Sequence, residues 1–379
     1  MHSAPTPEQE MLRASITEFL DRQAPPSSIT RIFREKRGYD PALYREVASL
    51  GWLGILIPES FGGAGLGVRD AAVAFEAFGH GPLPGPYFSS SVLSAILLLE
   101  GGTDQQKARY LPRIADGSLR ATLAAMDAGL GWGPDLVTSQ LHGAGAGATL
   151  SGEKAFVQDG EWADLLICLA KDEAAGQLSL VLVEAGADGL SVEPRSGMLT
   201  SVASVRLAGV SVGKDRFLGP RGQGWDLVER AAALTAPILC SFMVGGCRRV
   251  LDVTVQYTRD RWAFGQPIGR FQRVQDHVVD LVNHADAAAL LTGELLERTE
   301  AGEDVRALTH EARAVVTEAY YQACNYAHMV FAGPGTDLDH PLLSHTIMSR
   351  TLYQFLGDPA HHKRRMMDIL YPIKALTAT

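Results

Sequence analysis

The sequence predicts a three-part chain in which helices come first, short strands follow and long helices return. Apolar residues recur at helical spacing up to about residue 118. Between about 119 and 220, short β-rich runs are separated by glycines, which is typical of a small β-barrel or sandwich. Long helical stretches then suit an antiparallel bundle. We expect an N-terminal α-helical domain at 1–118, a middle β-barrel at 119–220 and a C-terminal four-helix bundle at 221–379.

The N-terminal part carries apolar stripes and helix start signals. Pro41 begins one helix, and residues 71–78 and 91–99 form apolar faces of two more. Thr103 and Gln106 make a capping box for a further helix. The glycine-rich segment 62–67 lacks the Gly-Lys-Ser/Thr of a phosphate-binding loop, so we expect only a connection there. The first helix has an apolar stripe made of Met11, Leu12, Ile16, Phe19 and Leu20.

The remaining elements are predicted from the hydrophobic period, which changes from helical to strand-like and back to helical along the chain. The predicted strands are 121–126, 149–157, 164–170, 178–183 and 202–207. The predicted helices of the bundle lie near 225–261, 271–300, 305–331 and 341–357.

Composition excludes several classes of protein. The chain has 379 residues, 46% hydrophobic and 20% charged, which is typical of a globular protein with a large core. A net charge of −9 argues against general nucleic-acid binding. We expect neither a membrane span nor a secretory signal. Its four scattered cysteines are expected to be buried thiols in a reducing cytoplasm, namely Cys168, Cys240, Cys247 and Cys324.

The segment 257–272 combines cationic and aromatic residues with a helix break. Arg259 and Arg261 close one predicted helix, and Gly265 and Pro267 separate it from the next. Arginines beside a helix break can clamp a phosphate or pyrophosphate. They can equally be solvated side chains that offset the helix dipole. Spacing alone leaves both interpretations open.

Four blocks of sequence together resemble one enzyme family. Residues 257–272 are similar to the Tyr-x-x-x-Arg-x-x-Phe-Gly-x-x-Ile-x-x-x-Gln signature of the flavin-dependent acyl-CoA dehydrogenases. Residues 50–67 resemble the family's Pro-Glu-x-x-Gly-Gly-x-Gly block, and residues 107–117 its following block. Residues 332–341 resemble the C-terminal glycine block. The blocks occur in the family's order and span most of the chain.

The resemblance implies an FAD cofactor and an acyl-CoA substrate. Such enzymes introduce an α,β double bond into a CoA thioester, and the flavin accepts the hydride. Electrons then pass to an electron-transfer flavoprotein. Arg261 would grip the FAD pyrophosphate, and Gly333 and Gly335 would let backbone approach the cofactor. The other implied cofactor contacts are Phe264, Ile268, Phe271 and Gln272 on the adenosine side, Met329 before the glycine block, and Phe156 and Gln158 beside the flavin.

Asp339 is the candidate base for proton abstraction from the carbon next to the thioester. It stands where the resemblance places a glutamate after the glycine block. Aspartate is about 1 Å shorter, and misplacement on that scale can cost on the order of 100-fold in rate. Asp339 can instead be the cap of the helix that begins at Pro341.

Other departures from the family pattern fall on one side of the cofactor site. The loop 126–135 lacks the hydroxyl side chains that touch the flavin ring in relatives, whereas the Arg-x-x-Phe-Gly segment given to a neighbouring subunit is intact. Some bacterial members are heterotetramers, notably in steroid side-chain degradation. We therefore expect one subunit of a hetero-oligomeric acyl-CoA dehydrogenase. The alternatives are a self-sufficient homo-oligomer and a non-catalytic partner that completes a homologue's FAD site.

Two further interpretations follow from individual residues. A nitroalkane-oxidase-like enzyme would use an aspartate base, but it needs a nearby arginine where this chain has Ala236 and Ile347. The adjacent His361 and His362 precede three basic residues and are expected to be a solvated helix end rather than a metal site.

Overall fold

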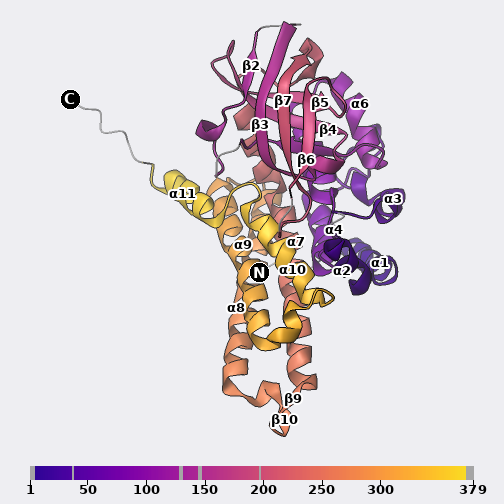
Figure 1. Cartoon of the computed structure of the whole chain (residues 1–379), viewed down its shortest axis with the longest axis vertical. Coiled ribbons are helices and arrows are strands. Elements are labelled where there is room, and N and C mark those ends of the chain that lie inside the picture. The colour runs from indigo at the N-terminus through magenta and orange to yellow at the C-terminus, as the bar shows by residue number, and fades with distance from the viewer. Residues whose placement is uncertain (1–4, 36–37, 128–130, 144–146, 196–197, 373–379) are drawn as a thin grey trace, which may run out of the picture.

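Six helices form the N-terminal part and pack beside the long C-terminal helices, with the sheet at one end of the molecule (Figure 1). The computed structural model describes residues 5–35, 38–127, 131–143, 147–195 and 198–372. The N-terminal helices are α1 (Pro7–Gln23), α2 (Pro26–Arg34), α3 (Pro41–Ser49), α4 (Val68–His80), α5 (Ala95–Gly101) and α6 (Asp104–Ala115).

Local capping explains where several of these helices begin. The predicted capping box is confirmed, since Thr103 Oγ1 accepts from the Gln106 amide at 3.2 Å and Gln106 Oε1 accepts from the Thr103 amide at 2.9 Å. Asp40 caps α3 at the Ala42 amide, with Pro41 in the first turn. Helix α2 was not predicted; its four buried side chains include two isoleucines that contribute to the main core.

The middle part is one eight-stranded sheet. Its hydrogen-bonded path runs β6-β7-β3-β2-β4-β5-β8, and β1 pairs with β4 beside β2. Within the described residues β6 and β8 are not paired with each other, so the sheet is open rather than a hydrogen-bonded closed barrel. The strands are β1 (Ala121–Ala124), β2 (Gln140–His142), β3 (Ala148–Gln158), β4 (Leu165–Asp172), β5 (Gln177–Glu184), β6 (Leu190–Pro194), β7 (Val202–Val212) and β8 (Phe217–Leu218).

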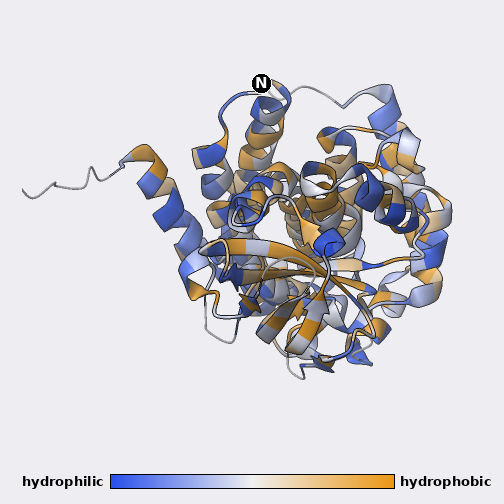
Figure 2. Cartoon of the chain, turned by 90° about the horizontal axis from the view of Figure 1, so that it is seen from above, coloured by the Kyte–Doolittle hydropathy of each residue, from blue (hydrophilic) through white to orange (hydrophobic). Residues whose placement is uncertain are grey.

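Strand β4 is buried on both faces and joins the two cores. Leu165, Ile167 and Leu169 belong to the large core shared with the helices. Leu166 and Cys168 point the other way, into a second core enclosed by the sheet itself. This double burial explains why β4 reads as a continuous apolar run. Seen from above, apolar colour gathers in the interior while the outer helices are mostly hydrophilic (Figure 2).

The C-terminal part contains the long helices α7 (Gly224–Asp260), α8 (Gln272–Glu300) and α9 (Arg306–Phe331). A short hairpin, β9 (Trp262–Ala263) and β10 (Gln266–Pro267), joins α7 to α8. Helix α7 is long and apolar enough to cross a membrane, but 72% of its most apolar window is buried inside the protein. Its apolarity therefore matches its place at the centre of the core.

The last predicted helix, 341–357, ends three residues earlier than expected, and a further helix that was not predicted follows it. Helix α10 (Pro341–Gln354) ends where Leu356 and Gly357 take positive φ of 58° and 101°. Asp358 then caps α11 (Pro359–Leu370), which stands out from the bundle in Figure 1. Positive φ cannot continue a helix, and Pro359 provides a new start.

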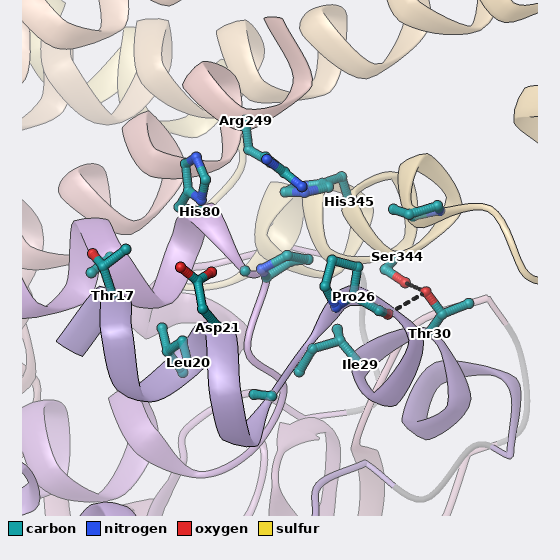
Figure 3. Close-up of a pocket in the computed structure, with 15 residues that line it drawn as sticks. Thr17, Leu20, Asp21, Pro26, Ile29, Thr30, His80, Arg249, Ser344 and His345 are labelled. Carbon is teal, nitrogen blue, oxygen red and sulfur yellow. Dashed lines mark hydrogen bonds between the residues drawn. The ribbon is translucent and has the colours of Figure 1, made fainter. Parts of the chain in front are cut away.

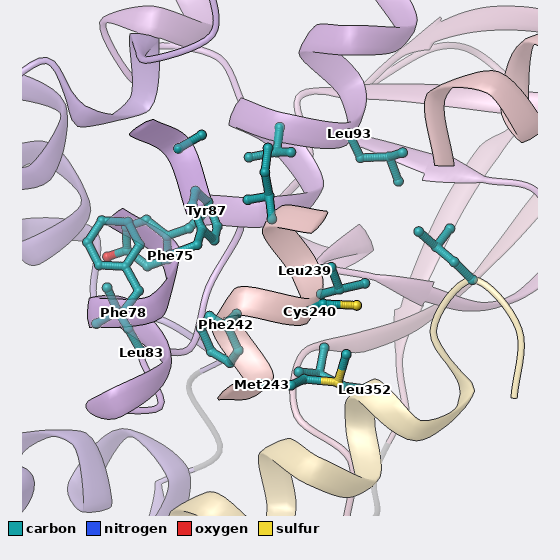
Figure 4. Packing of buried hydrophobic residues seen from close by; sticks show 14 of the residues in the cluster. Phe75, Phe78, Leu83, Tyr87, Leu93, Leu239, Cys240, Phe242, Met243 and Leu352 are labelled. Atoms are coloured by element: carbon teal, nitrogen blue, oxygen red, sulfur yellow. The ribbon is translucent and has the colours of Figure 1, made fainter. Parts of the chain in front are cut away.

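Helices α4 and α7 approach so closely that glycines are required at their contact. A Cβ on Gly79 would lie 1.8 Å from the carbonyl oxygen of Phe242, and one on Gly245 would lie 2.0 Å from that of Glu76. Figure 4 shows Phe75 and Phe78 facing α7 across this contact. The α4–α7 contact thereby joins the N-terminal helices to the C-terminal bundle.

Candidate functional site

The predicted cofactor residues that follow α7 lie on a protruding arm. Arg261 is the C-cap of α7, and the β9–β10 hairpin lies at the end of the molecule opposite the sheet (Figure 1). Phe264 adopts a φ of 51° and its side chain is 97% exposed, while Trp262 is 62% exposed. Aromatic side chains of this size are normally covered. The arm therefore presents an apolar tip that lacks a covering partner within the described chain.

The arm is also cationic. Arg259, Arg261 and Arg270 make no ion pair with the residues that the structure describes, whereas Arg273 one turn along α8 lies 3.5 Å from Asp276. Unpaired guanidinium groups next to exposed aromatic rings can bind a phosphate and stack on a planar base. We call residues 259–272 the arginine arm.

The remaining predicted contacts on this segment are brought together. The Ile268 amide donates to the Arg261 carbonyl at 2.8 Å, which closes the hairpin. The rings of Phe264 and Phe271 meet edge to face at 6.1 Å, and Gln272 begins α8. Sequence spacing thus placed four of these residues on one continuous loop and Gln272 at the start of the next helix.

The glycine block lies next to the base of the arm. Tyr257 stacks on Phe331 with ring centroids 4.3 Å apart, so the C-terminal ends of α7 and α9 meet. Met329 is 67% exposed there, and a Cβ on Gly333 would contact nothing within 4 Å. Gly335 differs, because a Cβ there would lie 2.9 Å from the Phe331 Cβ and so would be limited by the protein's own packing.

The predicted flavin-ring contacts lie far from the arm, on β3. Phe156 has a φ of 53° at a register shift and is 53% exposed. The Gln158 side-chain amide donates to the Thr200 carbonyl at 3.2 Å and to Asp159 at 3.3 Å, so it is already hydrogen-bonded within the protein. Between β3 and Leu356 the structure leaves a cavity of about 50 Å³. That space suits a few water molecules rather than a tricyclic ring. Residues 128–130 of the neighbouring loop lie outside the described residues.

Asp339 occupies the surface loop between α9 and α10. Its side chain is 70% exposed, and its carboxylate lies 2.6 Å from Arg34 Nη1. The cap of α10 is His340, whose Nδ1 accepts from the Leu342 amide, so the expected capping role of Asp339 is wrong. Arg34 does place an arginine beside the aspartate, but both side chains face solvent rather than a substrate cavity.

A cavity of about 400 Å³ lies between α7, α9 and α11. Four arginines and two carboxylates line it, together with a wall of small and apolar residues from α7. Two of the arginines are neutralised locally: Arg365 lies 2.8 Å from Glu229, and Arg306 lies 2.7 Å from Asp304. The lining residues used below are Ala232, Ala233, Ala236, Leu239, Thr309 and Arg313.

A pair of histidines, of which His362 is buried and His310 half-buried, borders this cavity. His310 Nδ1 lies 2.9 Å from His362 Nδ1, and His362 is 5% exposed. The expectation of a solvated helix end at His361 and His362 is therefore wrong for His362, because α11 turns that side chain inward. Burial lowers the pKa of His310 to about 4 and also lowers the pKa of His362, so both rings are neutral near pH 7.

A smaller pocket of about 120 Å³ lies between α1, α2, α4 and α10 (Figure 3). His80, Arg249 and His345 lie on one side of it, opposite Asp21. His345 Nδ1 is bonded to the Tyr320 hydroxyl at 2.9 Å, and burial lowers the pKa of His345 to about 3. The pocket is too small for an acyl chain, and His345 and Thr30 in its wall are already hydrogen-bonded within the protein.

Sequence reasoning missed the polar residues of α9 that line the large cavity. Arg313 stands between Ala312 and Ala314 on the buried face of a helix, and Thr309 precedes it by one turn. A charge within an apolar stripe was a usable signal. The distant residues that surround it, on α7 and α11, could not be paired with it from spacing.

Comparisons with known proteins match most of the chain. Residues 6–118 match the family "Acyl-CoA dehydrogenase, N-terminal domain", and residues 222–368 match "Acyl-CoA dehydrogenase, C-terminal domain". Acyl-CoA dehydrogenase IpdE2 of Mycolicibacterium smegmatis is 27% identical over 361 residues, which cover 95% of this chain and 97% of that protein.

Solved structures share the whole fold. The ChsE4–ChsE5 complex of Mycobacterium tuberculosis contains a chain that is 26% identical, with a TM-score of 0.88 and coverage of 98% of this chain and 99% of that one. PigA with FAD and proline is 23% identical, with a TM-score of 0.89 and coverage of 98% and 99%. At that identity the likeness to PigA shows the fold alone.

Proposed function

This chain belongs to the acyl-CoA dehydrogenase family of oxidoreductases, and on that premise we propose that it is one subunit of a hetero-oligomeric, FAD-dependent acyl-CoA dehydrogenase. In this proposal its arginine arm holds the adenosine diphosphate half of an FAD whose flavin ring lies in a homologous partner chain. The ChsE4–ChsE5 structure supports the proposal, because that related protein is itself a complex of two named chains.

The observation that carries the proposal is the exposed tip of the arm. Phe264 is 97% exposed, and Arg261, three residues earlier, makes no ion pair with the described residues, so both groups are available to a ligand and a neighbouring chain. A surface that combines aromatic anchors with arginine is typical of interface centres. The arm projects away from this chain's own β3, which favours a ligand shared between chains over one held by a single chain.

The described residues fit the adenosine diphosphate end of FAD better than its flavin-ring end. At the phosphate end, Arg261 would hold the pyrophosphate, Phe264 and Phe271 would pack against the adenosine, and Gly333 would leave room for the cofactor. Gln272 and Met329 would complete the contact. At the ring end, the cavity beside Phe156 holds about 50 Å³ and Gln158 is already hydrogen-bonded. FAD, when bound, supplies the hydride acceptor of the family's reaction.

We propose that the base for proton abstraction lies on the partner chain. A general base must come within hydrogen-bond reach of the proton that it removes. Asp339 is a surface carboxylate paired with Arg34 and is absent from the lining of the large cavity. Its role as base stays a prediction with little geometric support. An electron-transfer flavoprotein as electron acceptor and a cytoplasmic location are further parts of the proposal.

The visible absorption spectrum of the purified chain tests this proposal. We expect a colourless lone chain and a flavin spectrum after co-expression with a homologous partner. In that complex, Arg261→Gln should lower FAD occupancy by about tenfold or more, because a charge-assisted contact is lost. Arg273→Gln, in the first turn of α8 and paired with Asp276, is the control and should retain FAD. A lone chain that holds full FAD and is bleached by an acyl-CoA would overturn the shared-site proposal.

A further inference from the structure

We propose that the cavity between α7, α9 and α11 binds an apolar molecule that carries a carboxylate, with Arg313 as the counter-charge. The carboxylate belongs either to a free acid or to the far end of the acyl group of a CoA thioester. Only the thioester source rests on the proposed function. The binding of a free acid would hold whatever the chain's part in catalysis.

Arg313 is a fully buried cation that has no carboxylate partner among the described residues. It is 2% exposed and lines the cavity. Its Nη2 donates to the Phe355 carbonyl at 2.6 Å, and its Nε lies 3.5 Å from His362 Nε2. Its Nη1 is buried and has no hydrogen-bond partner among the described residues. A buried guanidinium is costly unless an anion compensates it, so the anion is expected from a ligand.

A second unsatisfied donor lies one helical turn away. Thr309 is 5% exposed, lines the same cavity, and its Oγ1 is buried without a partner in the described part of the chain. Residues four apart on a helix share one face, so Thr309 and Arg313 lie on the same side of α9. Two donors match the two oxygens of a carboxylate. A phosphate would leave further oxygens unsatisfied.

The rest of the lining indicates the body of the ligand. The α7 wall consists of Ala232, Ala233, Ala236 and Leu239, which leaves an apolar space within a cavity of about 400 Å³. The neighbouring rings of His310 and His362 carry no charge near pH 7, because burial lowers the pKa of each. The ligand is therefore apolar along most of its length and anionic at one end.

The other arginines that line the cavity differ from Arg313, because carboxylates neutralise two of them. Glu229 neutralises Arg365, and Asp304 neutralises the exposed Arg306. Arg230 has no ion pair with the described residues, and it lines the cavity four residues after Asp226 on α7. These partly exposed arginines are suited to the phosphates of a CoA carrier, whereas Arg313 is suited to a group that has entered the cavity.

Calorimetric titration of the full chain with octanoate and with octanamide tests the proposal. The two probes share an apolar chain, but only octanoate is charged. We expect octanoate to bind at least about tenfold more tightly, because a hydrogen bond to a charged group in a buried site is strong. Arg313→Met should abolish this preference, and Arg313→Lys should restore part of it. Arg273→Met, at an exposed arginine of α8 outside the cavity, should leave it unchanged.

Two CoA esters distinguish the sources of the carboxylate. If suberyl-CoA binds more tightly than octanoyl-CoA by a similar factor, the ligand is a thioester with a carboxylate at its far end. If only octanoate shows the preference, the ligand is a free acid. Equal affinity for octanoate and octanamide, with no preference between the CoA esters, would overturn the proposal. The probe comparison on the unaltered chain decides the question even if Arg313→Met fails to fold, and it needs no flavin.

Discussion

Lys154 shows at the residue scale how the sheet tolerates a charge in its interior. Its side chain is fully buried on β3, and its Nζ lies 2.7 Å from Asp127 Oδ1 and 3.1 Å from the Ala125 carbonyl oxygen. Burial lowers the pKa of Lys154. Burial also opposes ionisation of Asp127, but Lys154 and bonds from Ser139 outweigh it and lower the pKa of Asp127 overall. The pair is therefore ionised and ties the start of the β1–β2 loop to β3.

Lys154→Met should destabilise the protein by about 3–5 kcal/mol, because it leaves a buried carboxylate without its counter-charge. Urea unfolding followed by circular dichroism measures the change. The control is Arg273→Met, which removes an exposed pair with Asp276 and should cost less than about 1 kcal/mol. Similar losses for the two variants would contradict the buried-pair interpretation.

Glu184 controls part of the acid stability. A hydrogen bond from Arg216 at 2.7 Å, helped by Tyr110, lowers the pKa of Glu184 below its usual 4.5. A lowered pKa gives stability that is present above the unfolded value and lost as pH falls through the folded value. Glu184→Gln should therefore be less stable than the parent near neutral pH but lose less stability on acidification below about pH 4.5. Urea midpoints measured across that range test this, and parallel curves would show that Glu184 is not responsible.

At the scale of the element, the contact between α4 and α7 depends on glycine. Gly245→Ala would place a methyl group 2.0 Å from the Glu76 carbonyl oxygen, which belongs to helix backbone and cannot move alone. We expect a loss of about 3 kcal/mol or more, at the upper end of overpacking effects. Gly81→Ala is the control, because the nearest atom to its Cβ lies at 4.0 Å. Thermal unfolding compares the two, and equal melting temperatures would argue that the helices can separate freely.

Element boundaries were predictable where backbone chemistry sets them. The capping box at Thr103 and the proline at the start of α3 mark helix starts through local hydrogen bonds and fixed φ. Helix α11 was not predicted, and the end of α10 was placed three residues late, because leucine at position 356 does not announce the positive φ that it adopts. The edge strands β6 and β8 were not predicted either, because the pairing of an edge strand depends on residues far apart in sequence.

At the scale of the whole molecule, the arginine arm is expected to be an assembly surface. Phe264→Ser should leave the stability of the lone chain unchanged, because the side chain is 97% exposed. It should weaken association with the homologous partner by about 2 kcal/mol or more, as expected for an aromatic anchor. Sedimentation of mixed chains measures this. Leu66→Ser, at an exposed leucine of the N-terminal part, is the control. Unchanged association in Phe264→Ser would remove the arm from the interface.

The sequence by itself determined the order of the three parts, most helices, the family and the residues of the arginine arm. These features are local, because period, caps and contiguous motifs act over a few residues. Only the tertiary structure decided that Asp339 faces solvent beside Arg34 and that Gln158 is hydrogen-bonded to the Thr200 carbonyl. It also decided that Arg313, with its Nη1 lacking a partner among the described residues, lines a cavity bounded by α7 and α11. Burial and charge compensation depend on segments far apart in the chain, and no spacing along one segment encodes them.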